Sequence, residues 1–311
     1  MLAIVFPGQG SQKPGMGREL HGSFDPARSV FDEVHAATGI DVAALCFESD
    51  EETLRQTQNA QLALYTCGLA AWACLDVAPV AFAGHSVGEY AAVVAAGVLS
   101  VGEGAKLVRR RGEIMAASGA VRPGGMAAVL GLERPELEAA CRDASTESEV
   151  AVIANDNCPG QLVISGDKAA VERAGALATE RGAKRVLPLN VSGAFHSPLM
   201  HEPARGMGEA LRAAPFGEAK QRVGIYANVT AEKVSDANAW PDLLTQQLES
   251  PVRWTESVQA MRRDGITTFI ECGAGEVLGG LIRRTDREAE CLAVFDLASL
   301  EKTKAALAVQ A

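Results

Sequence analysis

The stretch Gly84-His85-Ser86-Val87-Gly88 decides the fold, because it joins a short apolar run to an Ala-rich helical pattern. Residues 77–83 predict a buried strand, and residues 87–99 have the small-residue spacing of a packed helix. A serine at such a corner sits in a sharp turn, with its hydroxyl exposed and its backbone N–H near a helix N-terminus. The flanking glycines allow the strand and the helix to pack closely. Ser86 is therefore our candidate nucleophile, and the pattern favours acyl chemistry.

The composition is that of a globular enzyme. Of the 311 residues, 48% are hydrophobic and 22% are charged. The formal net charge is -10 and the isoelectric point is about 5.1, which argues against a nucleic-acid partner because no basic stripe is present to neutralise phosphates. The seven cysteines are scattered without a CxxC pair, so we expect neither a disulfide framework nor a metal site, and a reducing cytoplasm as the location.

Neither the N-terminus nor any apolar run predicts membrane attachment. The sequence MLAIVFPGQG lacks the basic region of a signal peptide and reads as a first strand. The longest apolar stretch, residues 62–75, is too short to span a bilayer and is followed by Asp76 and Pro79. We therefore expect a cytoplasmic protein without a membrane partner.

Strand and helix patterns alternate along the chain, which predicts an α/β fold: a large α/β-hydrolase-like domain with a parallel sheet. The expected elements of this domain are strands at 3–6, 77–83, 223–227 and 267–271, and helices at 53–75, 87–99, 101–117 and 277–284.

Between residues 124 and 189 the rhythm changes to strand, helix, strand, strand, helix, strand. The predicted strands are 126–130, 150–154, 162–165 and 185–189, and the predicted helices are 135–144 and 168–181. This order is the split βαβ pattern of a ferredoxin-like unit. We therefore place a ferredoxin-like subdomain at 123–192, inserted into a discontinuous large catalytic domain formed by 1–122 and 193–311.

A serine hydroxyl needs a base to take its proton, so one of the five histidines must lie near Ser86. His196 lies where the insert rejoins the large domain, and a site between two domains is a common place for catalysis. His201 follows one turn later and is the second candidate. His85 adjoins Ser86 and is expected to point elsewhere, whereas His21 and His35 lie in polar segments and read as surface residues.

Two further features fit acyl transfer. The backbone N–H groups of Gln9, in the glycine loop after the first strand, and of Val87 could stabilise a developing oxyanion. The loop is not a dinucleotide fingerprint, because Lys13 stands where the third glycine would be. Arg111 would suit a substrate carboxylate, since a guanidinium donates two parallel hydrogen bonds. Spacing alone does not choose among Arg109, Arg110 and Arg111.

With these residues in this order, the chain resembles the malonyl-CoA:acyl carrier protein transacylases and the related acyltransferases of polyketide synthases. The likeness extends from residue 2 to about 284 and is carried by motifs in the same order. These are Phe6-Pro7-Gly8-Gln9-Gly10-Ser11-Gln12, Gly84-His85-Ser86-Val87-Gly88-Glu89, Arg111-Gly112, Asn155-Asp156-Asn157-Cys158-Pro159-Gly160-Gln161, Phe195-His196-Ser197, Asn228-Val229-Thr230, and Gln247-Leu248 through Pro251-Val252.

The resemblance implies roles for these residues. Ser86 would carry the malonyl ester, His196 would be its base, and Gln9 and Val87 would form the oxyanion hole. Arg111 would pair with the malonyl carboxylate. The remaining matches are Gln247, whose backbone carbonyl would orient the histidine, and Asn155, Asn157 and Asn228, which would line the cleft.

Phe195 is the residue that the resemblance connects with acyl choice, since phenylalanine there accompanies malonyl preference and serine accompanies methylmalonyl. Gly193 stands where many polyketide malonyl transferases carry histidine. The resemblance implies malonyl-CoA and an acyl carrier protein as partners, in fatty-acid or polyketide synthesis. It implies no cofactor beyond the phosphopantetheine that the carrier brings, and we expect a monomer.

Three alternatives remain at this stage. An acyl-carrier-protein hydrolase would use the same Ser86 and His196 with water as acceptor, but it would have no use for Arg111. An ordinary α/β-hydrolase esterase is disfavoured by the insert between Ser86 and His196 and by the absence of a late triad acid. A non-catalytic carrier-docking module would carry no ester on Ser86. For carrier docking, Arg283, Arg284 and Arg287 are the candidate basic residues.

Overall fold

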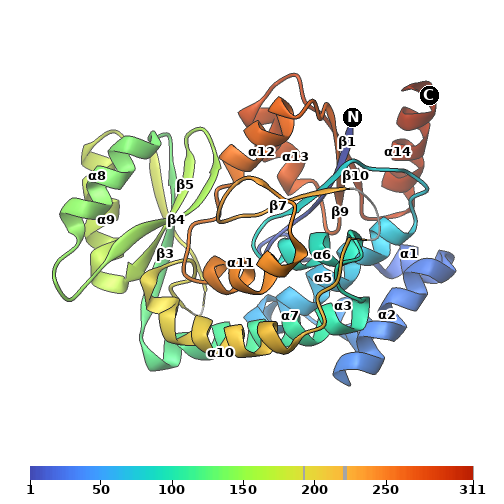
Figure 1. Ribbon diagram of the computed structural model, residues 1–311. Coiled ribbons are helices and arrows are strands. Elements are labelled where there is room, and N and C mark those ends of the chain that lie inside the picture. Colours follow the sequence, from blue (N-terminus) through green and yellow to red (C-terminus); the bar gives the residue numbers. More distant parts are fainter. Residues whose placement is uncertain (192, 220–222, 311) are drawn as a thin grey trace.

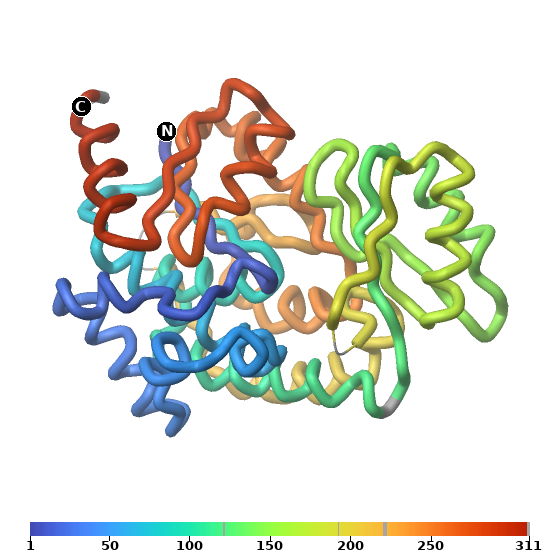
Figure 2. The backbone as a smooth tube through the Cα atoms, turned by 180° about the vertical axis from the view of Figure 1, so that it is seen from behind, coloured from blue at the N-terminus to red at the C-terminus, as the bar shows by residue number. Residues whose placement is uncertain are grey.

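The computed structural model describes residues 1–191, 193–219 and 223–310, which form a large unit and a small unit side by side (Figures 1 and 2). Residue 192, which ends the predicted subdomain, lies outside the described residues, as do 220–222 and 311 of the predicted large domain. The strands are β1 Leu2–Phe6, β2 Ala81–Gly84, β3 Gly124–Leu130, β4 Ala151–Cys158, β5 Gln161–Asp167, β6 Arg185–Pro188, β7 Gly224–Tyr226, β8 Lys233–Val234, β9 Thr268–Cys272 and β10 Glu290–Val294.

Helices lie on both faces of the larger sheet and on one face of the smaller sheet (Figure 1). Their bounds are α1 Arg18–Ser23, α2 Asp25–Thr38, α3 Val42–Phe47, α4 Glu51–Arg55, α5 Thr57–Ala73, α6 Gly88–Ala95, α7 Val101–Val121, α8 Arg134–Ala144, α9 Lys168–Glu180, α10 His201–Ala213, α11 Trp240–Gln247, α12 Trp254–Arg263, α13 Val277–Thr285 and α14 Leu297–Gln310, with short 3-10 turns at Pro198–Met200 and Ala237–Ala239. None of the helices in the described ranges has the length and apolar character that crossing a bilayer requires.

The large unit contains the predicted parallel sheet. Within the described residues its strand order is β10-β9-β1-β2-β7-β8, and β1 pairs in parallel with both β2 and β9. Only the last pairing, between β7 and β8 at the edge, is antiparallel. The carboxyl ends of β1 and β2 therefore lie next to each other, which brings the loop after Phe6 to the corner after Gly84.

Both faces of this sheet are buried, which explains why its strands are nearly continuous apolar runs. Ile4 and Phe6 point to the face packed with residues of α5, α6 and α7. Ala3 and Val5 point to the opposite face, where residues of α12 and α13 cover them.

The small unit has the predicted ferredoxin-like architecture. Its sheet is antiparallel with the order β4-β5-β3-β6, and its elements run from Gly124 to Pro188. Ala127 and Val129 of β3 face a separate core formed with α8 and α9. The fold class, a parallel α/β unit carrying a smaller ferredoxin-like unit, is thus confirmed.

Several predicted bounds need correction. β2 begins at Ala81 and not at 77, because Pro79 has no N–H to give to a neighbouring strand. α6 ends at Ala95, short of the predicted 99, because the chain turns at Gly97 with φ of 81°. The helix expected at 53–75 is divided between α4 and α5 at Gln56, whose extended backbone interrupts the helical turn. The elements that were not anticipated are β8, β10, α1, α2, α3, α10, α11, α12 and α14.

The small unit is attached to the large unit by hydrogen bonds that involve backbone and side-chain groups. The N–H of Asp156 in β4 donates to the carbonyl oxygen of Val252 at 2.9 Å, and the N–H of Val252 donates to the carbonyl of Ala154 at 2.9 Å. Arg284 of α13 also donates to the carbonyl of Pro159 at 3.1 Å. The two contacts of Val252 hold β4 beside the segment that follows α11. β4 therefore forms one wall of the cavity next to Ser86.

Candidate active site

Ser86 occupies the sharp corner between β2 and α6. Its φ of 53° is in the left-handed region, which a non-glycine residue adopts only when its surroundings require it. A Cβ on Gly84 would lie 1.9 Å from the carbonyl carbon of Gly88, and a Cβ on Gly88 would lie 2.1 Å from the carbonyl oxygen of Phe6. The two glycines of the motif are therefore required for the strand and the helix to meet at this corner.

His196 is the histidine that contacts Ser86. Its Nε2 lies 2.8 Å from Ser86 Oγ, and its Nδ1 lies 2.7 Å from the backbone carbonyl oxygen of Gln247. Because that carbonyl can only accept, Nδ1 carries the proton and Nε2 is free to accept one from the serine. His196 has φ of 56°, and its N–H donates to the carbonyl of Leu248 at 3.0 Å, so the segment after α11 fixes both its backbone and its ring.

The environment of His196 favours the neutral imidazole. Burial, reinforced by the positive charge of Arg111, lowers the pKa of His196 to about 3. At neutral pH the ring is therefore uncharged and able to take a proton from Ser86.

Arg111 lies in the buried base of the same site. Its side chain is fully buried, and its Nη2 donates to Ser86 Oγ at 3.0 Å and to Gln247 Oε1 at 2.9 Å. Burial lowers the pKa of this guanidinium from its ordinary value, although an arginine stays charged in proteins. The structure thus selects Arg111 among three adjacent arginines, because Arg109 pairs with Glu113 and Arg110 is exposed.

A buried hydrogen-bond network holds the turn at Ser86 in place. The N–H of Ser86 donates to Asn228 Oδ1 at 2.8 Å, and the amide of Asn228 donates to the carbonyl of Gly84 at 2.7 Å. The side-chain amide of Gln247 donates to the carbonyl of Ser86 at 2.9 Å and also to the carboxylate of Glu89. Glu89 accepts in addition from the N–H of Asn228 at 2.8 Å, and burial raises the pKa of Glu89 to about 7.

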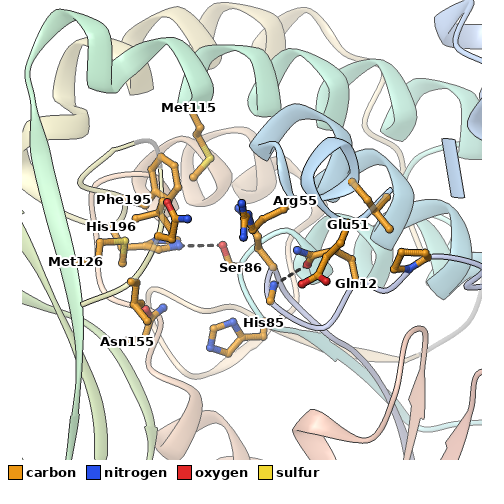
Figure 3. A pocket seen from close by; sticks show the side chains of 17 residues that line it. Gln12, Glu51, Arg55, His85, Ser86, Met115, Met126, Asn155, Phe195 and His196 are labelled. Carbon is orange, nitrogen blue, oxygen red and sulfur yellow. Dashed lines mark hydrogen bonds between the residues drawn. The ribbon is translucent and has the colours of Figure 1, made fainter. Parts of the chain in front are cut away.

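Ser86 and His196 open into a cavity of about 390 Å³ between the two units. Figure 3 shows the ring of Phe195 and the side chains of Met115 and Met126 on the His196 side of this cavity. The rest of the lining comes from Gln9, Gly10, Gln12, Pro14, Glu51, Leu54, Arg55, His85, Asn155, Leu189, Asn190 and Val191. The cavity has an apolar wall beside the nucleophile and a polar mouth at α4.

Gly193 gives the Phe195 ring the space it occupies. A Cβ at position 193 would lie 3.1 Å from Phe195 Cε1 and 2.6 Å from Ser118 Oγ. A Cβ at position 193 would therefore press mainly on Ser118 and would require the Phe195 ring to shift by a few tenths of an ångström.

The other residues singled out in the sequence take different positions. Gln9 and Asn155 line the cavity, whereas Val87 is buried at the start of α6 and Asn228 and Gln247 lie behind Ser86. Asn157 contacts the adjacent histidine instead, because its Oδ1 lies 2.8 Å from Nε2 of His85. His201, the second candidate base, is exposed and pairs with Glu249.

Two buried residues of the site were missed by sequence reasoning: Glu89, described above, and Gln61. Gln61 accepts a hydrogen bond from Nη1 of Arg111 at 2.7 Å. The signal was present in both cases, since Glu89 is the charged residue in the apolar sequence of α6 and Gln61 begins the largely apolar part of α5. Buried polar groups of this kind need specific partners.

The arrangement is suited to nucleophilic acyl chemistry. It offers a hydroxyl in contact with a neutral imidazole, a buried cation beside that hydroxyl, and the backbone N–H of Val87 at the N-terminus of α6. Within the described ranges, no group of three or more His, Cys, Asp or Glu side chains is placed to hold a metal ion.

Comparison with known proteins agrees with this chemistry. The acyl transferase domain matches residues 3–308. A malonyl CoA-acyl carrier protein transacylase of Bacillus subtilis is 42% identical over 303 residues, which is 96% of this chain and 95% of the relative.

Solved structures agree as well. The crystal structure of an acyl carrier protein S-malonyltransferase from Vibrio cholerae has 41% identity and a TM-score of 0.92, and the match covers 97% of this chain and 99% of that one. A malonyl-transacylase in complex with a type II polyketide synthase acyl carrier protein has 37% identity and a TM-score of 0.91, with 97% and 98% covered. With a match over nearly its whole length and a Ser–His pair set at the corner after a parallel strand, this chain belongs to the acyl transferase domain family.

Proposed function

We propose that this protein transfers a malonyl group from malonyl-CoA to the phosphopantetheine thiol of an acyl carrier protein, through an ester on Ser86. The observation that carries this proposal is the buried guanidinium of Arg111, 3.0 Å from Ser86 Oγ. A buried cation at this place matches an acyl group that ends in a carboxylate. The names of the relatives and the carrier bound to one of them support the same substrates.

In the first half-reaction His196 Nε2 takes the proton of Ser86 as Oγ attacks the thioester carbonyl carbon. The tetrahedral intermediate then collapses, the C–S bond breaks, and the proton on His196 passes to the departing CoA sulfur. The carbonyl of Gln247 holds the imidazole in the correct tautomer through the 2.7 Å contact with Nδ1.

The oxyanion hole would be formed by the N–H groups of Val87 and Gln9. The N–H of Ser86 already donates to Asn228, so the next free donor at the start of α6 is that of Val87. Gln9 lies on the other side of the cavity, in the loop after β1, which the register of β1 and β2 brings to this corner.

Arg111 would bind the malonyl carboxylate by two parallel hydrogen bonds, and Phe195 would limit the space beside the α-carbon. Asn155 lines the cavity from β4, and Asn157 acts through His85. A plain acetyl group would leave the buried charge of Arg111 unpaired, so dicarboxylic acyl groups are favoured.

In the second half-reaction the carrier thiol attacks the Ser86 ester and gives its proton to His196, which returns it to Ser86 Oγ as the ester bond breaks. Every proton in this cycle is held by the chain or its substrates, so we propose that no cofactor takes part. We also propose that the protein works as a monomer, since Ser86, His196 and Arg111 contact one another within a single chain.

The basic residues suggested for carrier docking lie on and after α13. Arg283, Arg284 and Arg287 are exposed, but Arg284 is also engaged with Pro159 and Gln161 of the small unit. We propose Arg283 and Arg287 as the more available charges for an acidic carrier.

Intact-mass measurement tests the proposal. After incubation with malonyl-CoA, we expect a malonyl adduct that is absent in Ser86→Ala and that transfers to a holo carrier protein. A hydrolase would instead release free malonate as fast as the carrier is loaded. That result, or an adduct that persists in Ser86→Ala, would overturn the proposed function.

A further inference from the structure

Gln61 is a buried amide that the reaction described above does not use. It lies in the second turn of α5, where nearly every neighbour is apolar, and its side chain is 1% exposed. Thr66, another buried polar residue of this helix, is satisfied locally, because its hydroxyl donates to the carbonyl of Leu62. Gln61 instead turns away from its own helix and toward α7.

Both ends of the Gln61 amide are occupied. Its Oε1 accepts from Nη1 of Arg111 at 2.7 Å, and its Nε2 lies 3.3 Å from Sδ of Met115, which is one turn further along α7. A glutamine held at both ends has a single orientation, and here that orientation presents its acceptor to the guanidinium.

The close approach of the two helices makes this contact possible. A Cβ on Gly112 would lie 2.7 Å from Cα of Gln58, so α7 approaches the backbone of α5 at the residue that follows Arg111. The pair Arg111-Gly112 therefore supplies both the charge and the space that lets Gln61 reach it.

The two Nη nitrogens of Arg111 are held by two different helices. Nη1 donates to Gln61 of α5, and Nη2 donates to Gln247 at the end of α11. Two anchors fix the rotation and the plane of a guanidinium, whereas one anchor leaves it free to rotate about that point. Nη2 also donates to Ser86 Oγ at 3.0 Å, so the guanidinium lies next to an acyl group that is esterified to that oxygen.

We infer that Gln61 is a positioning residue for acyl selectivity: it holds the Arg111 guanidinium so that its remaining donors face a carboxylate of the acyl group on Ser86. This inference rests on the proposed function. It predicts that loss of the Gln61 acceptor weakens the binding of carboxylated acyl groups while groups without a carboxylate are unaffected. Because the carboxylate is bound in both the ground state and the transition state, the effect falls on KM and not on kcat.

The test is Gln61→Met, which keeps the length of the side chain and removes the acceptor. Acylation of Ser86 is measured with malonyl-CoA and acetyl-CoA over a range of concentrations. We expect the malonyl-to-acetyl ratio of kcat/KM to fall about tenfold or more, as loss of a hydrogen bond to a charged group implies, through a rise in the malonyl KM. Gln61→Leu provides a second apolar variant in case the first does not fold.

Thr66→Val is the matched control, because it removes a buried hydrogen-bonding group from the same helix without touching Arg111. We expect it to leave the ratio unchanged. In an Arg111→Ala background, adding Gln61→Met should change the ratio less than twofold, since Gln61 acts through Arg111. Equal losses with both acyl groups, or full additivity in the double variant, would overturn the inference. Failure of the wild-type chain to form a malonyl ester would instead overturn the proposed function itself.

Discussion

The carbonyl oxygen of Gln247 lies 2.7 Å from Nδ1 of His196, at the position that a carboxylate takes in a Ser-His-Asp triad. A neutral carbonyl orients the imidazole but adds little charge stabilisation to an imidazolium. Burial and the nearby positive charge of Arg111 lower the pKa of His196 to about 3, and the hydrogen bond to the Gln247 carbonyl offsets that shift only in part. Nε2 of His196 can therefore accept a proton from Ser86 at neutral pH without first losing one.

The pH profile of Ser86 acylation tests this relationship. Because the depressed pKa keeps His196 neutral above pH 5, the histidine should contribute no loss of rate between pH 8 and 5. Burial raises the pKa of Glu89 to about 7, so we expect the acylation rate to change slope near pH 7 in the wild-type protein. This change of slope should be absent in Glu89→Gln. Single-turnover acylation rates would show it. A fall near pH 6.5 that survives in Glu89→Gln would mean that His196 keeps its ordinary pKa.

Arg111→Ala should turn the protein away from malonyl groups. Removing the buried guanidinium costs about 1.5–3 kcal/mol of carboxylate binding, which is roughly a tenfold to hundredfold loss in kcat/KM for malonyl-CoA, while acetyl-CoA is used as well or better. Arg110→Ala, on the exposed side of the same helix, is the control and should change neither rate. Unaltered malonyl selectivity in Arg111→Ala would refute the role given to it.

Phe195→Ala should admit a branched acyl group. The Phe195 ring lines the cavity beside His196, so its removal opens space next to the α-carbon of the acyl chain. One methyl group is worth about 1–3 kcal/mol in such a pocket, so acylation by methylmalonyl-CoA should rise about tenfold relative to malonyl-CoA. The ratio of the two adducts in a competition experiment, read by intact mass, measures it. A constant ratio would show that the wall against the methyl group lies elsewhere.

Gly84→Ala should destabilise the protein by about 3 kcal/mol or more, because the new methyl group would lie 1.9 Å from the carbonyl carbon of Gly88. Gly206→Ala is the matched control. Gly206 lies within α10 with open space around its Cα, so alanine there should stabilise the protein by about 0.5–1 kcal/mol. Urea denaturation of the two variants gives both values, and similar midpoints would contradict the close packing at the corner.

Glu271→Gln should flatten the dependence of stability on pH. Burial raises the pKa of Glu271 to about 7, and its Oε2 accepts from the N–H of Gly279. A carboxyl group whose pKa is raised on folding contributes stability that is present below its unfolded pKa and is lost as pH rises through 7. Wild-type stability should thus fall by roughly 1–3 kcal/mol more than that of the variant between pH 5 and pH 8. Parallel urea midpoints for the two proteins at both pH values would contradict this.

Much of the fold can be predicted from the sequence because the patterns that indicate it involve neighbouring residues. The alternation of apolar runs and helical patterns predicts the parallel sheet, and the strand and helix order at 124–189 predicts the ferredoxin-like unit. The role of Gly84 and Gly88 at the Ser86 corner can be predicted for the same reason, since only a few residues separate them. Among the missed elements, β8 and β10 are short strands at the two edges of the large sheet, with weaker apolar patterns.

The sequence by itself determined the candidate nucleophile, the class of fold and, through its motifs, the family. The resemblance pointed to His196 and Arg111, but only the tertiary structure shows that both contact Ser86. The reason is that Ser86 and His196 are 110 residues apart, and the contact between His196 and Gln247 spans 51 more. The tertiary structure also showed Glu89 and Gln61 as buried partners. The physical reason is that a hydrogen bond depends on distances of about 3 Å between atoms, and packing of separate helices sets those distances.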